Sequence, residues 1–155
     1  MNKKLLLVVA HKPSPNTENL AKAVMRGCTA VETKNVEVTC LSPFDATPND
    51  VLSCSAIILG TTENLGYMSG AIKDFFDRIY YPCIEHTQGL PYALYVRAGL
   101  DGTGARRSVE TVVKGLRWRS VQEPMVLQGN YKVVFADQCC ELGMAMSVGL
   151  ETGIF

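Results

Sequence analysis

Apolar residues gather in five short runs, and most of these runs are separated by segments in which apolar positions recur every three or four residues. Runs of this length, rich in Val, Leu and Ile, are typical of strands buried on both faces of a parallel sheet. We therefore predict strands at 5–10, 36–41, 54–60, 91–96 and 124–128, with 132–136 as a further extension of the last one. The strand at 36–41 alternates apolar and polar residues and is expected nearer to an edge.

The segments between the runs predict helices with one buried face. One begins near Thr17 and repeats apolar residues as far as Val31, and a second covers 70–81 and ends before Pro82. Two more are centred on 109–116 and 142–150. Residues 43–50 are predicted as a polar turn, 61–69 as a loop around Gly66, and 97–104 as a glycine-containing loop.

The succession of strands and helices predicts one α/β domain over 1–155, with helices on both faces of a five-stranded parallel sheet. At this length the strand order 2-1-3-4-5 fits best, and such sheets bind ligands where the strand order reverses. The loops at 11–16, 61–69 and 97–104 follow the first, third and fourth strands. We expect them to meet at that point and to form the ligand site.

The first of these loops carries several helix-start residues. Ser14 is a candidate N-cap with Pro15 at the first helical position, and Asn16 or Thr17 is a candidate cap one turn later. Free N–H groups and the helix dipole at such a start suit a phosphate, but an ordinary capped connection explains the same residues. His11 either donates to that phosphate or only ends the strand.

Composition narrows the function. Fifteen basic and fifteen acidic residues cancel, so neither nucleic acid nor an anionic membrane is an expected partner, and no segment is expected to span a membrane. Six cysteines without a CxxC motif and only two histidines predict no metal site. We interpret the cysteines as reduced thiols of a cytoplasmic protein.

Three stretches resemble a known family, the flavodoxin-like NAD(P)H-dependent FMN reductases. Residues 14–21, Ser-Pro-Asn-Thr-Glu-Asn-Leu-Ala, resemble its phosphate loop, and 61–70 with the following 73–78 resemble its second flavin loop and helix. The tail 141–155 is similar to that of small flavodoxin-family proteins. The resemblance spans nearly the whole chain and implies a three-layer flavodoxin-like fold.

The resemblance also implies FMN as the cofactor, NAD(P)H as co-substrate, and roles for particular residues. The phosphate would contact Ser14, Asn16 and Thr17, with His11 as a further candidate. The isoalloxazine would lie beside Thr62, Glu63, Asn64, Leu65, Gly66 and Tyr67, and its pyrimidine end would be bordered by Ala98, Gly99 and Gly102. One departure concerns the Ser-Pro-Arg that begins the loop in many relatives: here it is His11-Lys12-Pro13, and Lys12 keeps the charge without the bidentate fork.

The leading hypothesis is an oxidoreductase that passes hydride from NAD(P)H through FMN to a quinone, flavin or similar small acceptor. The cofactor carries the chemistry, so no catalytic acid or base is nominated. The resemblance also suggests a homodimer. The alternative is a flavodoxin-type electron carrier without NAD(P)H activity, although such carriers tend to be strongly acidic.

Two other hypotheses have less support. A phosphoacceptor receiver domain needs an acidic pair after the first strand and an aspartate after the third, where this chain has His11-Lys12 and Gly60. A domain that keeps the fold without flavin and acts through protein contacts is the fourth. Trp118 is expected to cover the core. Tyr80-Tyr81 are expected to pack at a helix end or in a dimer contact, with covering a flavin of a second subunit as the less favoured alternative.

Overall fold

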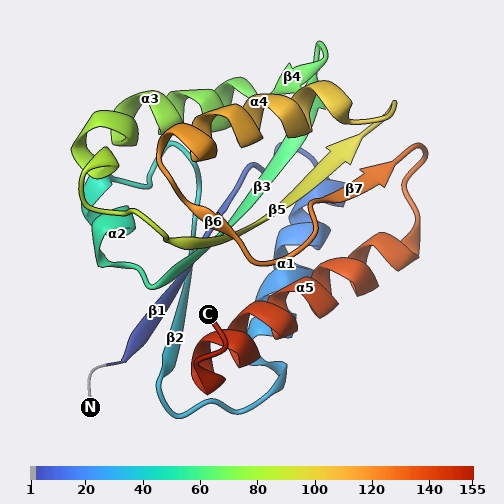
Figure 1. Cartoon of the computed structure of the whole chain (residues 1–155). Helices are drawn as coiled ribbons and strands as arrows, with labels where there is room; N and C mark the ends of the chain where they lie inside the picture. Colours follow the sequence, from blue (N-terminus) through green and yellow to red (C-terminus); the bar gives the residue numbers. More distant parts are fainter. Residues whose placement is uncertain (1–2) are drawn as a thin grey trace.

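The computed structural model describes residues 3–155 as a twisted sheet between two layers of helices (Figure 1). Helices α1 (Pro15–Ala30) and α5 (Val133–Thr152) cover one face, and α2 (Pro48–Ser53), α3 (Gly70–Ile84) and α4 (Thr103–Gly115) cover the other. The α/β class with helices on both faces is confirmed.

The sheet has seven strands, which are β1 (Lys4–Ala10), β2 (Val36–Leu41), β3 (Ala56–Asn64), β4 (Tyr67–Met68), β5 (Pro91–Ala98), β6 (Arg119–Ser120) and β7 (Met125–Gln128). Their order is β2-β1-β3-β5-β6, with β7 also on β5 and β4 on β3. The predicted count of five and the numbered order 2-1-3-4-5 are wrong, because two-residue strands enter the sheet. One of them, β4, is antiparallel to its neighbour.

Strand β1 shows why these apolar runs form the centre of the sheet. Leu6 and Val8 point into the core beneath α1 and α5, whereas Leu7 and Val9 point into the core beneath α3 and α4. All four side chains are almost completely buried. Because successive side chains of a strand face opposite sides, only an apolar run without alternation can fill both cores.

Three local predictions are wrong. Helix α3 continues past Pro82 to Ile84, and the completely buried side chain of Cys83 holds this last turn in the core. A short helix, α2, begins inside the segment predicted as a turn and extends to Ser53. Residues 132–136 lead into α5 instead of extending a strand. Within this first turn Phe135 is buried, whereas the two preceding residues, Val133 and Val134, are exposed.

Helix α5 is long and apolar enough to cross a membrane by length and composition, so the expectation of no such segment is wrong on those criteria. Its apolar side chains instead fill the core shared with α1 and the sheet. Gly27 of α1 and Gly143 of α5 allow the two backbones to approach closely: a Cβ at Gly143 would lie 2.1 Å from the carbonyl oxygen of Val24. The apolar character of α5 therefore comes from its place in the core.

The remaining aromatic prediction concerns Trp118, which does cover the core. It is 7% exposed and its indole Nε1–H donates to the hydroxyl of Thr87 at 2.9 Å. Tyr80 packs at its helix end against Gly115 and meets Tyr81 edge to face, while Tyr81 itself is 81% exposed.

Candidate functional site

The carboxyl ends of β1, β3 and β5 lie at one edge of the sheet. Ala10 pairs with Gly60, and Gly60 with Tyr95, so the three strands reach this edge in register. The N–H of His11, the first residue after β1, donates to the carbonyl of Gly60 at 2.9 Å. The loops that follow the three strands therefore start side by side, as the strand order predicts.

The loop after β3 is more regular than predicted. Strand β3 continues to Asn64, and the chain returns as β4, with Glu63 paired to Met68. Leu65 and Gly66 form the turn, both in the left-handed region with φ of 55° and 72°. Two consecutive residues of positive φ are typical of a tight hairpin turn whose twist matches the strands. The prediction of a loop over 61–69 is wrong for most of its length, because the segment is a β-hairpin with its turn at Leu65 and Gly66.

This hairpin is held against the start of α4. The N–H of Met68 donates to Ser108 Oγ at 3.0 Å, and the backbone of Gly66 lies so close to Gly104 that a Cβ there would be 1.7 Å from the Gly66 oxygen. At the base, Thr61 Oγ1 accepts from the N–H of Ser69, which in turn caps α3. Sequence analysis missed Ser108 and Gly104, because their role depends on a contact between segments 40 residues apart.

The hairpin and the neighbouring loop expose apolar side chains. Leu65 is 105% exposed, Leu100 77% and Tyr67 44%. The contact between Gly66 and Gly104 joins the two loops, so the three side chains belong to the same edge of the sheet. Large apolar groups exposed together in this way favour an apolar ligand or partner. We call Leu65, Tyr67 and Leu100 the apolar rim.

Three of the other residues predicted in the second loop, Thr62, Glu63 and Asn64, are polar residues of the hairpin strand β3. The hydroxyl of Thr62 donates to Asn64 Oδ1 at 2.9 Å, which fixes the side chain of Asn64 at the end of β3. Glu63 is half-buried. The hairpin thus brings together all six residues predicted from Thr62 to Tyr67.

The third loop places Gly99 at the surface and buries Ala98 and Gly102. Gly102 caps α4 with φ of 70°, and a Cβ there would meet Val126 at 2.6 Å, so packing as well as backbone conformation requires glycine. The carbonyl of Ala98 accepts from the N–H of Gly129 at 2.8 Å and from Arg97 Nη1 at 2.7 Å. A fourth loop, which begins at Gly129, therefore borders the third.

Arg97 is a half-buried cation at this border that sequence analysis missed. Its Nη1 also donates to the carbonyl of Leu127 at 3.0 Å, and its guanidinium lies 5.2 Å from the centre of the Phe135 ring. A charged residue within an otherwise buried strand was the available indication in the sequence. It fixes the ends of β5 and β7 relative to the start of α5.

The first loop is closed on itself. Ser14 is the N-cap of α1, and its side chain accepts from the N–H of Thr17 at 3.2 Å, while the N–H of Ser14 donates to Thr17 Oγ1 at 2.9 Å. This settles the N-cap as Ser14. Asn16 is exposed, and burial lowers the pKa of His11, which favours its neutral form.

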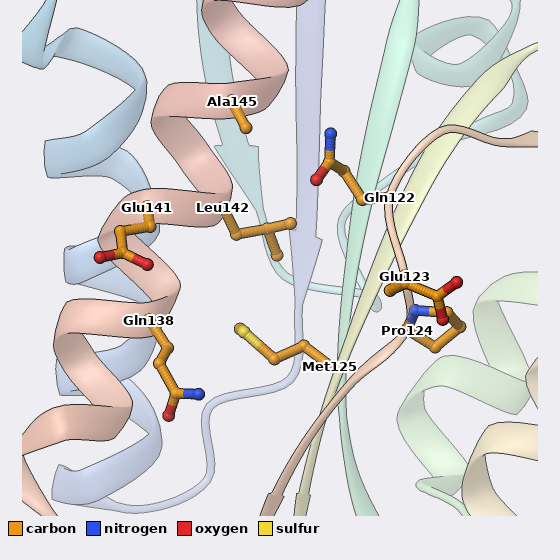
Figure 2. A pocket seen from close by; sticks show the side chains of 8 residues that line it. All are labelled: Gln122, Glu123, Pro124, Met125, Gln138, Glu141, Leu142 and Ala145. Atoms are coloured by element: carbon orange, nitrogen blue, oxygen red, sulfur yellow. The ribbon is translucent and has the colours of Figure 1, made fainter.

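A separate cavity of about 400 Å³ lies on the α5 side of the sheet (Figure 2). Residues from 122–125 face α5 across it, and Met125 and Leu142 form its apolar floor, with Gln138 and Glu141 on the helix. None of the predicted site residues lines it. Within residues 3–155, no group of three or more His, Cys, Asp or Glu side chains is arranged to hold a metal ion.

Comparison with solved structures establishes the fold. A flavodoxin from the domain Archaea matches with a TM-score of 0.78 and 20% identity over 94% of this chain and 98% of that one. Flavodoxin from Megasphaera elsdenii matches at 0.75 and 17% over 92% and 98%, and a flavodoxin, WrbA-like protein from Agrobacterium tumefaciens at 0.71 and 16% over 95% and 96%. The chain thus has a flavodoxin-like α/β fold. No protein-family model and no curated protein sequence matches it.

Proposed function

We propose that this protein binds FMN at the carboxyl edge of β1, β3 and β5 and uses it as an oxidoreductase. The single observation that carries the proposal is the apolar rim, which a rigid hairpin presents at the edge where the strand order reverses. Leu65, Tyr67 and Leu100 would otherwise expose large apolar surface to water. The flavodoxin and WrbA-like neighbours support FMN as the ligand.

The ring side of the site fits a flavin. Isoalloxazine is a flat, largely apolar tricycle with polar atoms along one end, and the rim supplies two aliphatic side chains and one aromatic ring. The exposed backbone of Gly66 and Gly99 allows close approach, because nothing lies within 4 Å of where their Cβ atoms would be. The polar end would meet backbone groups of the loop after β5.

A bound flavin would supply hydride acceptance and release, chemistry that belongs to the cofactor. The residues of this chain would bind and orient the ring. Tyr67 would shield one part of it from water, and the hydrogen bond between Met68 and Ser108 would keep the hairpin in place. We nominate no acid or base, and we propose NAD(P)H as electron donor and a quinone, flavin or similar small molecule as acceptor.

Titration of the purified protein with FMN, followed by flavin fluorescence and the visible spectrum, tests the binding. Tyr67→Ala should weaken binding by about 2- to 13-fold, corresponding to about 0.5–1.5 kcal/mol for an aromatic contact. Ile154→Ala is the control, since Ile154 is also an exposed apolar residue but follows the end of α5, away from the hairpin. Equal affinity of both variants and the wild type would remove the rim from the site, and no FMN uptake would reject the proposal.

A second candidate is an electron carrier that does not itself oxidise NAD(P)H. Several solved structures that match nearly the whole chain are flavodoxins, which favours it. The net charge of zero is less typical of a carrier that finds its partners by charge. Anaerobic addition of NADH or NADPH to the FMN-loaded protein separates the two: bleaching of the flavin supports the reductase, and its absence with both nucleotides supports the carrier.

We further propose a cytoplasmic location and a homodimer. All six cysteines are free thiols in the structure, and none forms a disulfide even though Cys28, Cys139 and Cys140 lie in the same helical layer. Free thiols are usual in a reducing compartment. The exposed Tyr81 is a candidate dimer contact. Sedimentation of the purified protein with and without Tyr81→Ala would test the dimer.

A further inference from the structure

The residues Ser14-Pro15-Asn16-Thr17 have a second copy in the chain, Thr47-Pro48-Asn49-Asp50. Both begin a helix with an extended cap residue followed by proline. At α1 the two cap hydrogen bonds measure 3.2 Å and 2.9 Å, and the equivalent bonds at α2 measure 3.3 Å and 2.7 Å. The two segments are thus the same capping device.

The second copy of this device lies away from the proposed flavin site. The start of α2 lies beside the end of α3, where the thiol of Cys83 is 3.8 Å from the carbonyl oxygen of Pro48. Helix α3 begins at the carboxyl edge of the sheet, next to the hairpin, and its end is therefore at the opposite edge. The pattern at α2 only caps a helix, so its presence at α1 is no evidence for phosphate binding.

The N–H groups of the first loop also offer little to a phosphate. Pro13 and Pro15 have none, and the N–H groups of Ser14 and Thr17 are engaged in the cap. Within the described chain, only Lys12 and Asn16 of residues 12–17 keep an N–H without a hydrogen bond. Phosphate loops use several adjacent N–H groups, usually with glycines that let them converge, whereas the first glycine after β1 here is Gly27.

The charges of the loop are no more favourable to a dianion. Glu18, in the first turn of α1, places a carboxylate at the positive end of the helix dipole. His11 is half-buried with a lowered pKa, so it adds no positive charge at neutral pH. The one cation in the loop is Lys12, which is exposed; burial raises the pKa of the Cys40 thiol, and the charge of Lys12 opposes that rise.

We infer that the loop from Lys12 to Thr17 contributes little to flavin binding, so that the protein selects flavins by the ring and accepts riboflavin nearly as well as FMN. The exposed Lys12 and Asn16 would then supply most of the loop's contacts to the 5′-phosphate, because the hydroxyl of Thr17 donates to the carbonyl of Ser14 at 3.0 Å and lies 3.0 Å from the Ser14 hydroxyl. This inference rests on the proposed flavin site but concerns its specificity. It makes Pro13 and Pro15 specificity-determining residues, because they withhold the N–H groups that a phosphate needs.

The test compares dissociation constants for FMN and riboflavin by flavin fluorescence. We expect the two to agree within about tenfold for the wild type, whereas one charge-assisted hydrogen bond alone is worth about that factor or more. Pro13→Gly with Pro15→Gly should tighten FMN binding and leave riboflavin binding unchanged. Pro48→Gly, which alters the equivalent cap at α2, should change the affinity for neither flavin.

Ser14→Ala distinguishes a cap from a phosphate ligand. We expect it to lower the midpoint of thermal unfolding while the ratio of the two affinities stays constant. A selective loss of FMN affinity in Ser14→Ala, or a wild-type preference for FMN of more than about tenfold, would overturn the inference and leave the proposed flavin site intact. If neither flavin binds, the proposed function fails as well.

A measurement on the bound phosphate gives an independent result. In ³¹P spectra of bound FMN, an exposed phosphate should titrate with its ordinary second pKa of about 6. A phosphate held by several N–H donors would stay dianionic well below that pH. Protection from titration in the wild type would contradict the inference even if both flavins bound equally.

Discussion

The contact between Gly104 and Gly66 provides the sharpest test of how the hairpin is held. A Cβ on Gly104 would lie 1.7 Å from the carbonyl oxygen of Gly66 and 2.6 Å from its carbonyl carbon. Both atoms are backbone, so no side-chain rotation relieves the clash. Restoring an ordinary carbon–oxygen contact of about 3.3 Å requires the hairpin and α4 to separate by about 1.6 Å.

We expect Gly104→Ala to destabilise the protein by about 1–3 kcal/mol, the usual cost of overpacking. The intrinsic preference of alanine for a helix opposes this by about 0.5–1 kcal/mol, and the clash should win. The same separation would stretch the hydrogen bond between Met68 and Ser108. The hairpin would then loosen, and FMN affinity would fall with it.

Urea unfolding measures the change in the free energy of unfolding. At an m-value of about 2 kcal/mol/M, the midpoint should fall by about 0.5–1.5 M. Gly70→Ala is the matched control: it also adds a methyl group to the first turns of a helix, but into open space, and should be neutral or stabilising. This account of the hairpin would be refuted if Gly104→Ala were as stable as the wild type and the amide resonance of Met68 did not move.

Three further predictions concern the fold. Arg78→Lys should cost about 1–3 kcal/mol in urea unfolding, because a lysine cannot replace a guanidinium that donates to Asp74 and to two backbone carbonyls; stability equal to the wild type would contradict this. Thr87→Val should cost a similar amount in thermal unfolding by leaving the buried indole N–H of Trp118 without an acceptor, whereas Thr87→Ser should retain most of the stability. Burial raises the pKa of three thiols from 9.0 to about 12, so between these pH values the folded state keeps protons that the unfolded state releases. The free energy of unfolding should therefore fall as the pH rises from 9 to about 12. Replacing these thiols by alanine should flatten that part of the profile. The thiols are Cys28, Cys54 and Cys139.

The sequence by itself determined the class of the fold and which loops lie together at the carboxyl edge of the sheet. Strands such as 5–10 must be buried on both faces, because an uninterrupted apolar run has no side that tolerates water. Alternation with amphipathic helices then requires a sheet between two helical layers, with the loops after β1, β3 and β5 at one edge. All of this depends on periodicities that neighbouring residues already display.

Only the tertiary structure decided what those loops are. The motif Ser-Pro-Asn-Thr fits a phosphate loop and a helix cap equally well from its residues alone, and the hydrogen bonds between Ser14 and Thr17 show that it caps α1. The hairpin of β3 and β4 forms because α4 offers Ser108 and a bare Gly104 to hold it. These contacts join residues 38 and 40 positions apart, so no local pattern in the sequence indicates them. They form only once the sheet has brought the loops together.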